Sequence, residues 1–167
     1  MPNVVGVGLT SLKIGAIAAD GGMGTTLATV GKTFKDSCQI TEEDGELTEW
    51  FSEEDDDPLY SKQAKGKFSI TFQVMDADAD ALLALKGGTV SGTAPKVWSA
   101  PATAPNIEKS VEIILSTGQK LQIVRGRIVA KQSGTVGKSG IVLVDVTITA
   151  LTPTKAATAP LMWTNAS

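Results

Sequence analysis

The sequence predicts a mainly β domain with one packed helix, and three observations lead to this fold class. Short runs in which apolar and polar residues alternate recur along the chain, which is the pattern of half-buried strands. The 17 glycines fall mostly in short clusters between β-branched runs, where they indicate turns. Helix signals are confined to one segment, residues 76–86. Aromatic residues make up only 5% of the chain, so the core is expected to be aliphatic, as between stacked sheets.

Length and composition predict one domain. A chain of 167 residues can bury roughly 70% of its unfolded surface, so one core is the default. We expect this domain to cover residues 1–152, with residues 153–167 as a C-terminal tail outside the core. Cys38 is the only cysteine, which excludes an intrachain disulfide and indicates a packing role. No apolar run approaches the roughly 20 residues of a membrane helix, and we expect no membrane partner.

The first half of the chain predicts four strands. Residues 11–30 read as a hairpin, because alternation around Leu12 and Ile14 leads into an Asp-Gly-Gly turn and a second β-prone run. Residues 33–40 are expected to form a third strand. The clearest strand signal lies at residues 67–74, where phenylalanine, isoleucine and valine alternate with serine, threonine and glutamine.

Residues 41–67 predict a long charged hairpin. Ten of the 18 acids lie between Glu42 and Asp57, and a lysine-containing run follows at residues 61–67. Too few apolar residues occur here for a core, so the segment either pairs with itself or remains a disordered acidic loop. Weak cross-strand charge pairing favours the hairpin. The expected register places Glu49 opposite Lys62, Glu46 opposite Lys65 and Asp44 opposite Lys67.

The helix is expected at residues 76–86. Asp76 is a good N-cap, and the aspartates that follow it suit the positive end of a helix dipole. Gly87 and Gly88 then end the helix. Residues 91–106, rich in proline, alanine, threonine and glycine, predict a surface loop.

The β signal returns after this loop. Residues 110–115, 121–131 and 142–148 each alternate in the manner of strands, and short glycine-containing turns separate them. We expect the second of these strands to bend at Gly126. Together the three predict an antiparallel meander.

The chemistry-bearing residues predict no enzyme, no cofactor and no metal site. The chain has no histidine, which removes the commonest general base and zinc ligand. The Gly-Lys-Ser sequence at 137–139 lacks the glycine that a phosphate-binding loop needs five residues earlier, where Gln132 stands. The alternating aspartates at 76–80 imitate a calcium loop, but Ala81 and Gly87 occupy positions that require glycine and glutamate.

Net charge and the positions of the tryptophans leave two kinds of function open, assembly with neighbouring subunits and the binding of a ligand. A net charge of −3 argues against a protein that grips nucleic acid, because such binding depends on lysine and arginine. Trp50 in the hairpin, Trp98 in the loop and Trp163 in the tail each look like an anchor for a neighbouring surface. The alternative is a β-sandwich binding module, either a capsid decoration or a carbohydrate-binding domain, that uses Trp98 or Trp163.

The order of the predicted elements resembles the tail tube proteins, or major tail proteins, of long, non-contractile-tailed bacteriophages. The resemblance is carried by the amino-terminal strand pair, the hairpin containing residues 53–60, the strand at 67–74, the helix from Asp76 to Leu85 and the closing meander. It covers nearly the whole chain. That family has no short diagnostic motif, and contractile-tail and secretion-system tubes share the same layout.

The resemblance implies both a fold and a function. It implies a β-sandwich or half-barrel with one flanking helix and a long projecting charged hairpin, in hexameric rings stacked into a tube. DNA is expected to pass through the lumen during ejection without specific binding, which suits an acidic chain. The implied location is the tail of the virion, after assembly in the host cytoplasm. Implied partners are further copies of the chain and the tail terminator, tape-measure and baseplate proteins.

The residues predict where copies of the chain meet. The acidic tip of the hairpin is expected to contact a basic surface of a neighbouring copy, with the available cations largely in the closing meander. The tail from Thr152 is expected to act in assembly, so that its removal leaves the fold nearly unchanged. The candidate assembly residues are Trp50, Glu53, Glu54, Asp55, Asp56, Asp57 and Tyr60 in the hairpin, Lys120, Arg125, Arg127, Lys131 and Lys138 in the meander, and Trp163 in the tail.

Overall fold

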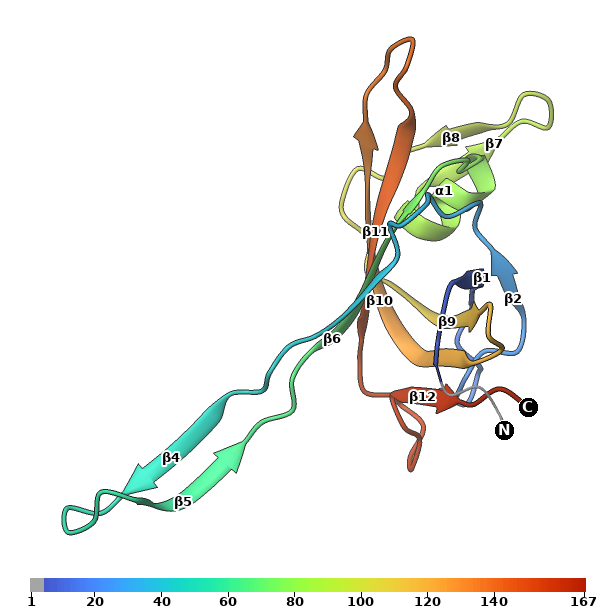
Figure 1. Ribbon diagram of the computed structural model, residues 1–167. Helices are drawn as coiled ribbons and strands as arrows, with labels where there is room; N and C mark the ends of the chain where they lie inside the picture. The colour runs from blue at the N-terminus through green and yellow to red at the C-terminus, as the bar shows by residue number, and fades with distance from the viewer. Residues whose placement is uncertain (1–4) are drawn as a thin grey trace.

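The computed structural model, which describes residues 5–167, is built around one eight-stranded antiparallel sheet (Figure 1). Strands make up 47% of the chain and helix 5%, which confirms the mainly β fold with a single helix. The strand order is β2-β1-β9-β10-β11-β6-β3, and β12 also pairs with β10. The strands of this sheet are β1 (Leu9–Gly15), β2 (Leu27–Thr29), β3 (Gln39–Glu42), β6 (Phe68–Val74), β9 (Ile107–Leu115), β10 (Lys120–Gly134), β11 (Val142–Ala150) and β12 (Leu161–Thr164).

Two smaller hairpins and the helix complete the fold. The first hairpin pairs β4 (Leu47–Phe51) with β5 (Pro58–Gln63), and the second pairs β7 (Thr89–Ser91) with β8 (Val97–Ser99). The helix is α1 (Ala79–Lys86). None of the described helical residues forms a segment long and apolar enough to cross a membrane.

The predicted amino-terminal hairpin is confirmed, while the third strand lies later than expected. Strands β1 and β2 pair in antiparallel register, with Ile14 opposite Ala28. We expected a strand at residues 33–40, but Thr33 forms only an isolated bridge to Val74. The strand itself, β3, begins at Gln39 and pairs with the first half of β6.

The closing meander of β9, β10 and β11 is confirmed, as is a bend in its middle strand. The pairing of β10 with β9 shifts register between Ile123 and Gly126. A Cβ atom on Gly126 would lie 2.7 Å from Cγ2 of Ile148, so glycine permits a close approach of β11 at the bend. Before the bend β10 pairs with β12, and after it β10 pairs with β11.

The core lies between the curved sheet and α1. Apart from Phe72, the buried apolar side chains of the core are aliphatic, as the composition predicts, and they come mainly from β6, β9, β10 and β11. The buried Ser110 ties the β1–β2 loop to this core. Its hydroxyl donates to the carbonyl of Val124 (2.7 Å) and accepts the N–H of Gly24 (2.9 Å).

The helix begins three residues later than expected. Asp78, not Asp76, is the N-cap, and its carboxylate accepts the N–H of Ala81 at 2.8 Å. The carboxylate of Asp76 accepts the N–H of Lys32 instead. Sheet pairing therefore continues through Met75, whose N–H donates to the carbonyl of Lys32, and delays the helix. The predicted end is confirmed, because Gly87 adopts a φ of 70° and its N–H donates to Leu83.

Two leucines on α1 form a matched pair for testing the helix packing. Leu85 is 1% exposed and Leu83 is 39% exposed. We expect Leu85→Ala to lower the free energy of unfolding by about 2–5 kcal/mol, because it opens a cavity in the core. Leu83→Ala should change it by less than about 1 kcal/mol. Chemical denaturation of both variants measures the difference, and equal losses would contradict this packing.

The C-terminal tail is not outside the sheet, so that prediction is wrong. Residues 161–164 form β12, which pairs with Lys120–Ile123 of β10, and Leu161 packs against the core. The short apolar run ending at Trp163 has no clear alternation, and the signal for a strand was missed for that reason. The tail therefore completes the sheet by pairing with residues 120–123 of β10, the part of the strand that β11 does not reach.

Candidate assembly interface

The charged hairpin projects from the body of the molecule as an arm, defined here as residues 43–67 (Figure 1). It continues from β3 and β6, and every residue of β4 and β5 is exposed. These two strands pair with each other in a sheet of their own. The arm is thus an ordered hairpin and not a loop.

The register of the arm differs by one residue from the predicted one. Lys62 lies opposite Thr48, and Glu49 lies opposite Ser61. The rings of Trp50 and Tyr60, which are opposite each other, have centroids 5.2 Å apart. The observed register thus brings the two rings into contact and does not form the predicted pair of Glu49 with Lys62. An aromatic pair of this kind contributes about 0.5–1.5 kcal/mol.

The arm exposes a series of large apolar side chains to solvent. Phe51 is 57% exposed and Leu59 is 71% exposed, and neither has a core to enter. An isolated two-stranded hairpin is only marginally stable in water, and contiguous apolar exposure typically marks an interaction surface. The exposed apolar residues of the two arm strands are Leu47, Trp50, Phe51, Leu59 and Tyr60.

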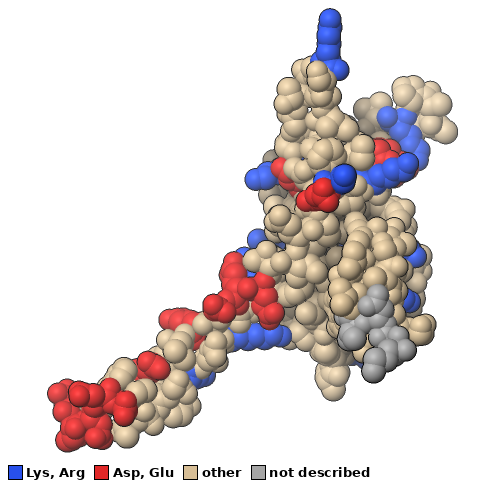
Figure 2. Space-filling model, in the orientation of Figure 1, with Lys and Arg blue, Asp and Glu red and all other residues tan. Residues whose placement is uncertain are grey.

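The tip of the arm gathers carboxylates. Glu53, Glu54, Asp55, Asp56 and Asp57 lie in the loop between β4 and β5, and Figure 2 shows acidic atoms massed at this end. The backbone of the loop is closed by the Ser52 hydroxyl, which accepts the N–H of Asp55 at 3.0 Å. None of the ion pairs in the described part of the chain includes an arm residue.

Charge is segregated between the arm and the rest of the chain. The arm holds nine of the 18 acids and three of the 15 basic residues, which gives 3 − 9 = −6. The remaining residues hold 12 basic residues and nine acids, which gives 12 − 9 = +3. The two parts are therefore electrostatically complementary.

The cations predicted to receive the tip are not gathered at one site. Lys120 begins β10 beside β12, whereas Lys138 lies in the loop between β10 and β11, at the opposite end of the meander. Arg127 and Lys131 lie between them on the second half of β10, and both are exposed.

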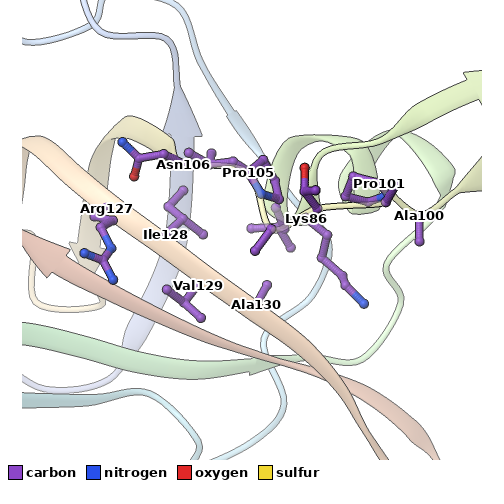
Figure 3. Close-up of a pocket in the computed structure, with 14 residues that line it drawn as sticks. Lys86, Ala100, Pro101, Pro105, Asn106, Arg127, Ile128, Val129 and Ala130 are labelled. Atoms are coloured by element: carbon purple, nitrogen blue, oxygen red, sulfur yellow. The ribbon is translucent and has the colours of Figure 1, made fainter.

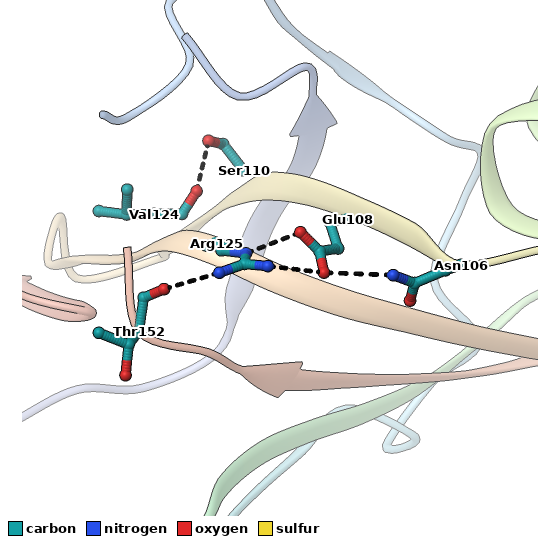
Figure 4. Close-up of polar contacts among 6 residues, drawn as sticks. All are labelled: Asn106, Glu108, Ser110, Val124, Arg125 and Thr152. Atoms are coloured by element: carbon teal, nitrogen blue, oxygen red, sulfur yellow. Dashed lines mark hydrogen bonds and ion pairs between the residues drawn. The ribbon is translucent and has the colours of Figure 1, made fainter. Parts of the chain in front are cut away.

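Arg125 is held within its own chain and is not available to a neighbour. Its Nε lies 2.7 Å from Oε2 of Glu108 and its Nη2 lies 3.0 Å from Oε1, in a bidentate ion pair (Figure 4). Nη1 also donates to the carbonyl of Thr152 at 3.1 Å. The ion pair between Arg125 and Glu108 could not be predicted from the sequence, because the pairing of β9 with β10 shifts register at the bend.

The Glu108–Arg125 pair predicts a dependence of stability on pH. The guanidinium of Arg125 lowers the pKa of the Glu108 carboxyl below its ordinary value of about 4.3. A carboxyl whose pKa is lowered by folding stabilises the fold above the unfolded-state pKa, and this contribution is lost as pH falls through the folded-state pKa. Glu108→Gln should therefore destabilise the protein at pH 7 and have a smaller effect below about pH 4.

The matched control for this prediction is Glu112→Gln. Glu112 lies on the same strand, but its carboxylate accepts from the Gln122 amide at 2.8 Å and not from a guanidinium. Thermal unfolding measured from pH 7 to pH 3 compares the two variants. If the loss caused by Glu108→Gln stayed constant over that range, the ion pair would not be its origin.

The three tryptophans lie on three different sheets and form no common stacking platform. Trp50 is on β4 of the arm, Trp98 on β8 and Trp163 on β12. The indole N–H of Trp98 donates to the carbonyl of Gly87 at 2.8 Å, and Nζ of Lys86 lies 5.1 Å from its ring centroid. Trp98 is thus packed within its own chain, on a short hairpin where we expected only a loop. Trp163 remains 51% exposed.

The described residues show no cluster of three or more histidine, cysteine, aspartate or glutamate side chains that could hold a metal ion. Cys38 is half-buried and packs against the core, and burial raises the pKa of its thiol. It has the character of a packing residue and not that of an activated nucleophile.

Comparison with known proteins adds no family to this description. No protein-family model matches the sequence, and a search of curated proteins finds no match.

Proposed function

We propose that the protein is a structural subunit that assembles with copies of itself into stacked rings, forming a phage tail tube that conducts DNA during ejection. The observation that carries this proposal is the arm. It places five large apolar side chains and an acidic tip in solvent, on strands β4 and β5, whose residues are all exposed. Contact with another molecule would cover these side chains.

The charge distribution supports a second copy of the same chain as that molecule. The arm carries a net charge of −6 and the rest of the chain carries +3, so each copy offers both halves of a complementary pair. The arm extends away from its own body in Figure 1, which favours contact between copies. A surface that differs from its partner surface generates head-to-tail assembly, as in rings and filaments.

Open strand edges support the closure of rings. The eight-stranded sheet ends at β2 and β3, and neither has a further strand on its outer side among the described residues. All four residues of β3 are exposed. Free edges are a liability in a monomer, and pairing between identical subunits removes them.

The remaining features of the proposal rest on the resemblance to tail tube proteins. They are six subunits in each ring, a position in the virion tail, no enzymatic activity, and contacts with tail terminator, tape-measure and baseplate proteins. The acidic balance of the chain agrees with a conduit, because a basic lining would retain phosphate groups by counterion release.

Sedimentation velocity at rising protein concentration tests the proposed self-assembly. We expect the single-copy boundary to give way to rings and larger species at low salt, and addition of salt to weaken this transition because the arm tip is exposed. Sedimentation that is independent of concentration would contradict the proposal.

A further inference from the structure

We propose that the arm of one copy docks into a hollow on the next copy, formed between α1, the loop after β8 and the second half of β10. This inference rests on the proposed self-assembly and names the surface that receives the arm. The hollow has a volume of about 560 Å³, within the range of roughly 300–1,000 Å³ that is usual for clefts receiving ligands.

The hollow is apolar and carries positive charge at its ends. Pro101, Pro105, Ile128 and Ala130 line it, together with Lys86 and Arg127, and no acidic residue contributes to its lining. Figure 3 shows Arg127 toward one end and Lys86 toward the other.

The cations of this surface are not held in salt bridges within residues 5–167, although Nζ of Lys86 lies over the Trp98 ring. None of the ion pairs in the described part of the chain uses Lys86, Arg127 or Lys131. Lys131 follows Arg127 and Val129 at a spacing of two along β10, so the three side chains point to the same face of that strand. Glu108 lies opposite Arg127 and Asp145 lies opposite Lys131 on the neighbouring strands, but neither acid lines the hollow, so the lining itself carries positive charge. A positively charged surface attracts an acidic segment.

One wall of the hollow is a strand with an unpaired edge. The pairing of β9 with β10 ends where Ile107 lies opposite Ile128. Beyond that point, Val129–Gly134 pair with β11 on one side and, within residues 5–167, with no strand on the other. Val129 is 53% exposed at this edge. Open edges are recurrent sites for the addition of an extended segment or hairpin.

The occupant that fits this surface is the arm of a second copy. The arm supplies what the hollow lacks, because exposed aromatic side chains at Trp50, Phe51 and Tyr60 adjoin a tip of five carboxylates. The chain cannot fill its own hollow, since the arm projects away from the body on which α1 packs (Figure 1). We expect Trp50 and Tyr60, whose rings are in contact, to enter the hollow while the tip acids meet Lys86 and Arg127.

Disulfide trapping tests this contact directly. Two variants of the full chain, both carrying Cys38→Ala, would have one new cysteine each, Glu54→Cys in the arm tip and Ala102→Cys beside the hollow. Mixing them under mild oxidation should give a cross-linked pair on a denaturing gel. The control is a variant that carries Ser139→Cys, in the exposed β10–β11 loop, and keeps Ala102. The yield of cross-linked pair with this variant should be at least about tenfold lower.

Charge reversal provides a second test, with a matched control in the same chain. Lys86→Glu with Arg127→Glu should raise the concentration needed for assembly at least about tenfold, because like charges would then face each other. Lys120→Glu with Lys138→Glu makes the same change in net charge outside the hollow and should have little effect. Adding Asp55→Lys, Asp56→Lys and Asp57→Lys to the first variant should restore assembly, which a loss of folding would not allow.

The outcomes separate this inference from the proposed function. If the native chain forms tubes but the arm and hollow give no cross-link and the reversed hollow assembles normally, the docking inference is wrong and the tube proposal stands. If cross-linked pairs form but no rings or tubes appear at any concentration, docking stands and the proposed function is wrong.

Discussion

Changing Asp55, Asp56 and Asp57 together to Lys is expected to abolish assembly at low salt while leaving the fold intact. The three residues lie at the exposed tip of the arm and contribute nothing to the core. The reversal replaces attraction to the cations of a neighbouring copy by repulsion, and like charges facing each other cost several kcal/mol. Light scattering follows the loss of assembly, and circular dichroism confirms the fold.

Neutralisation and salt are the controls for this prediction. Changing the same three residues to Asn should give an intermediate effect, because attraction is removed and no repulsion is introduced. At about 1 M salt the Debye length falls to about 3 Å, so the native chain and both variants should converge. Tubes of ordinary length from the reversed variant at low salt would show that the tip is not a contact between copies.

Removal of the tail after Thr152 is expected to destabilise the fold strongly, contrary to the expectation from sequence. The truncation deletes β12, whose register with β10 places Leu161 opposite Ile123, a fully buried residue. Loss of one packed leucine side chain already costs about 2–5 kcal/mol, and the truncation also leaves a row of backbone groups on β10 without partners. Thermal and chemical unfolding of the truncated chain measure the loss.

A shorter truncation separates the effect of β12 from that of the end of the chain. Deleting residues 165–167 removes no strand residue and should leave the unfolding transition nearly unchanged. If the chain truncated after Thr152 unfolds at the native temperature, β12 contributes nothing to the fold and the tail acts only between copies.

The sequence predicts the elements whose side chains alternate over a long run. Strand β6 and the meander were predictable because one face is buried and the other is not, so the period of two is visible along the chain. Strand β12 has only four residues, and strands β7 and β8 have three each. None of them is long enough to show an alternation of apolar and polar residues. The helix start was misplaced because Asp76 and Asp78 are equally good caps, and the pairing of Met75 with Lys32 decides between them.

The candidate site was predictable in part. The arm could be recognised from its charges and from its lack of a core, but the order of charges predicts a register that differs by one residue from the observed one, in which Trp50 lies opposite Tyr60. The hollow could not be predicted, because α1, the loop after β8 and β10 are brought together only by folding. Likewise, the sequence gives no sign that Arg125 is held by Glu108 while Arg127 remains exposed.

The most direct test of self-assembly is negative-stain electron microscopy of the purified protein over a range of concentrations. Segregated charge, open sheet edges and the exposed apolar side chains of the arm predict rings at low concentration and tubes of stacked rings at higher concentration, at low salt. Fields that contain only single copies, from a sample that remains monomeric up to millimolar concentration, would contradict the proposal that this chain builds a tube.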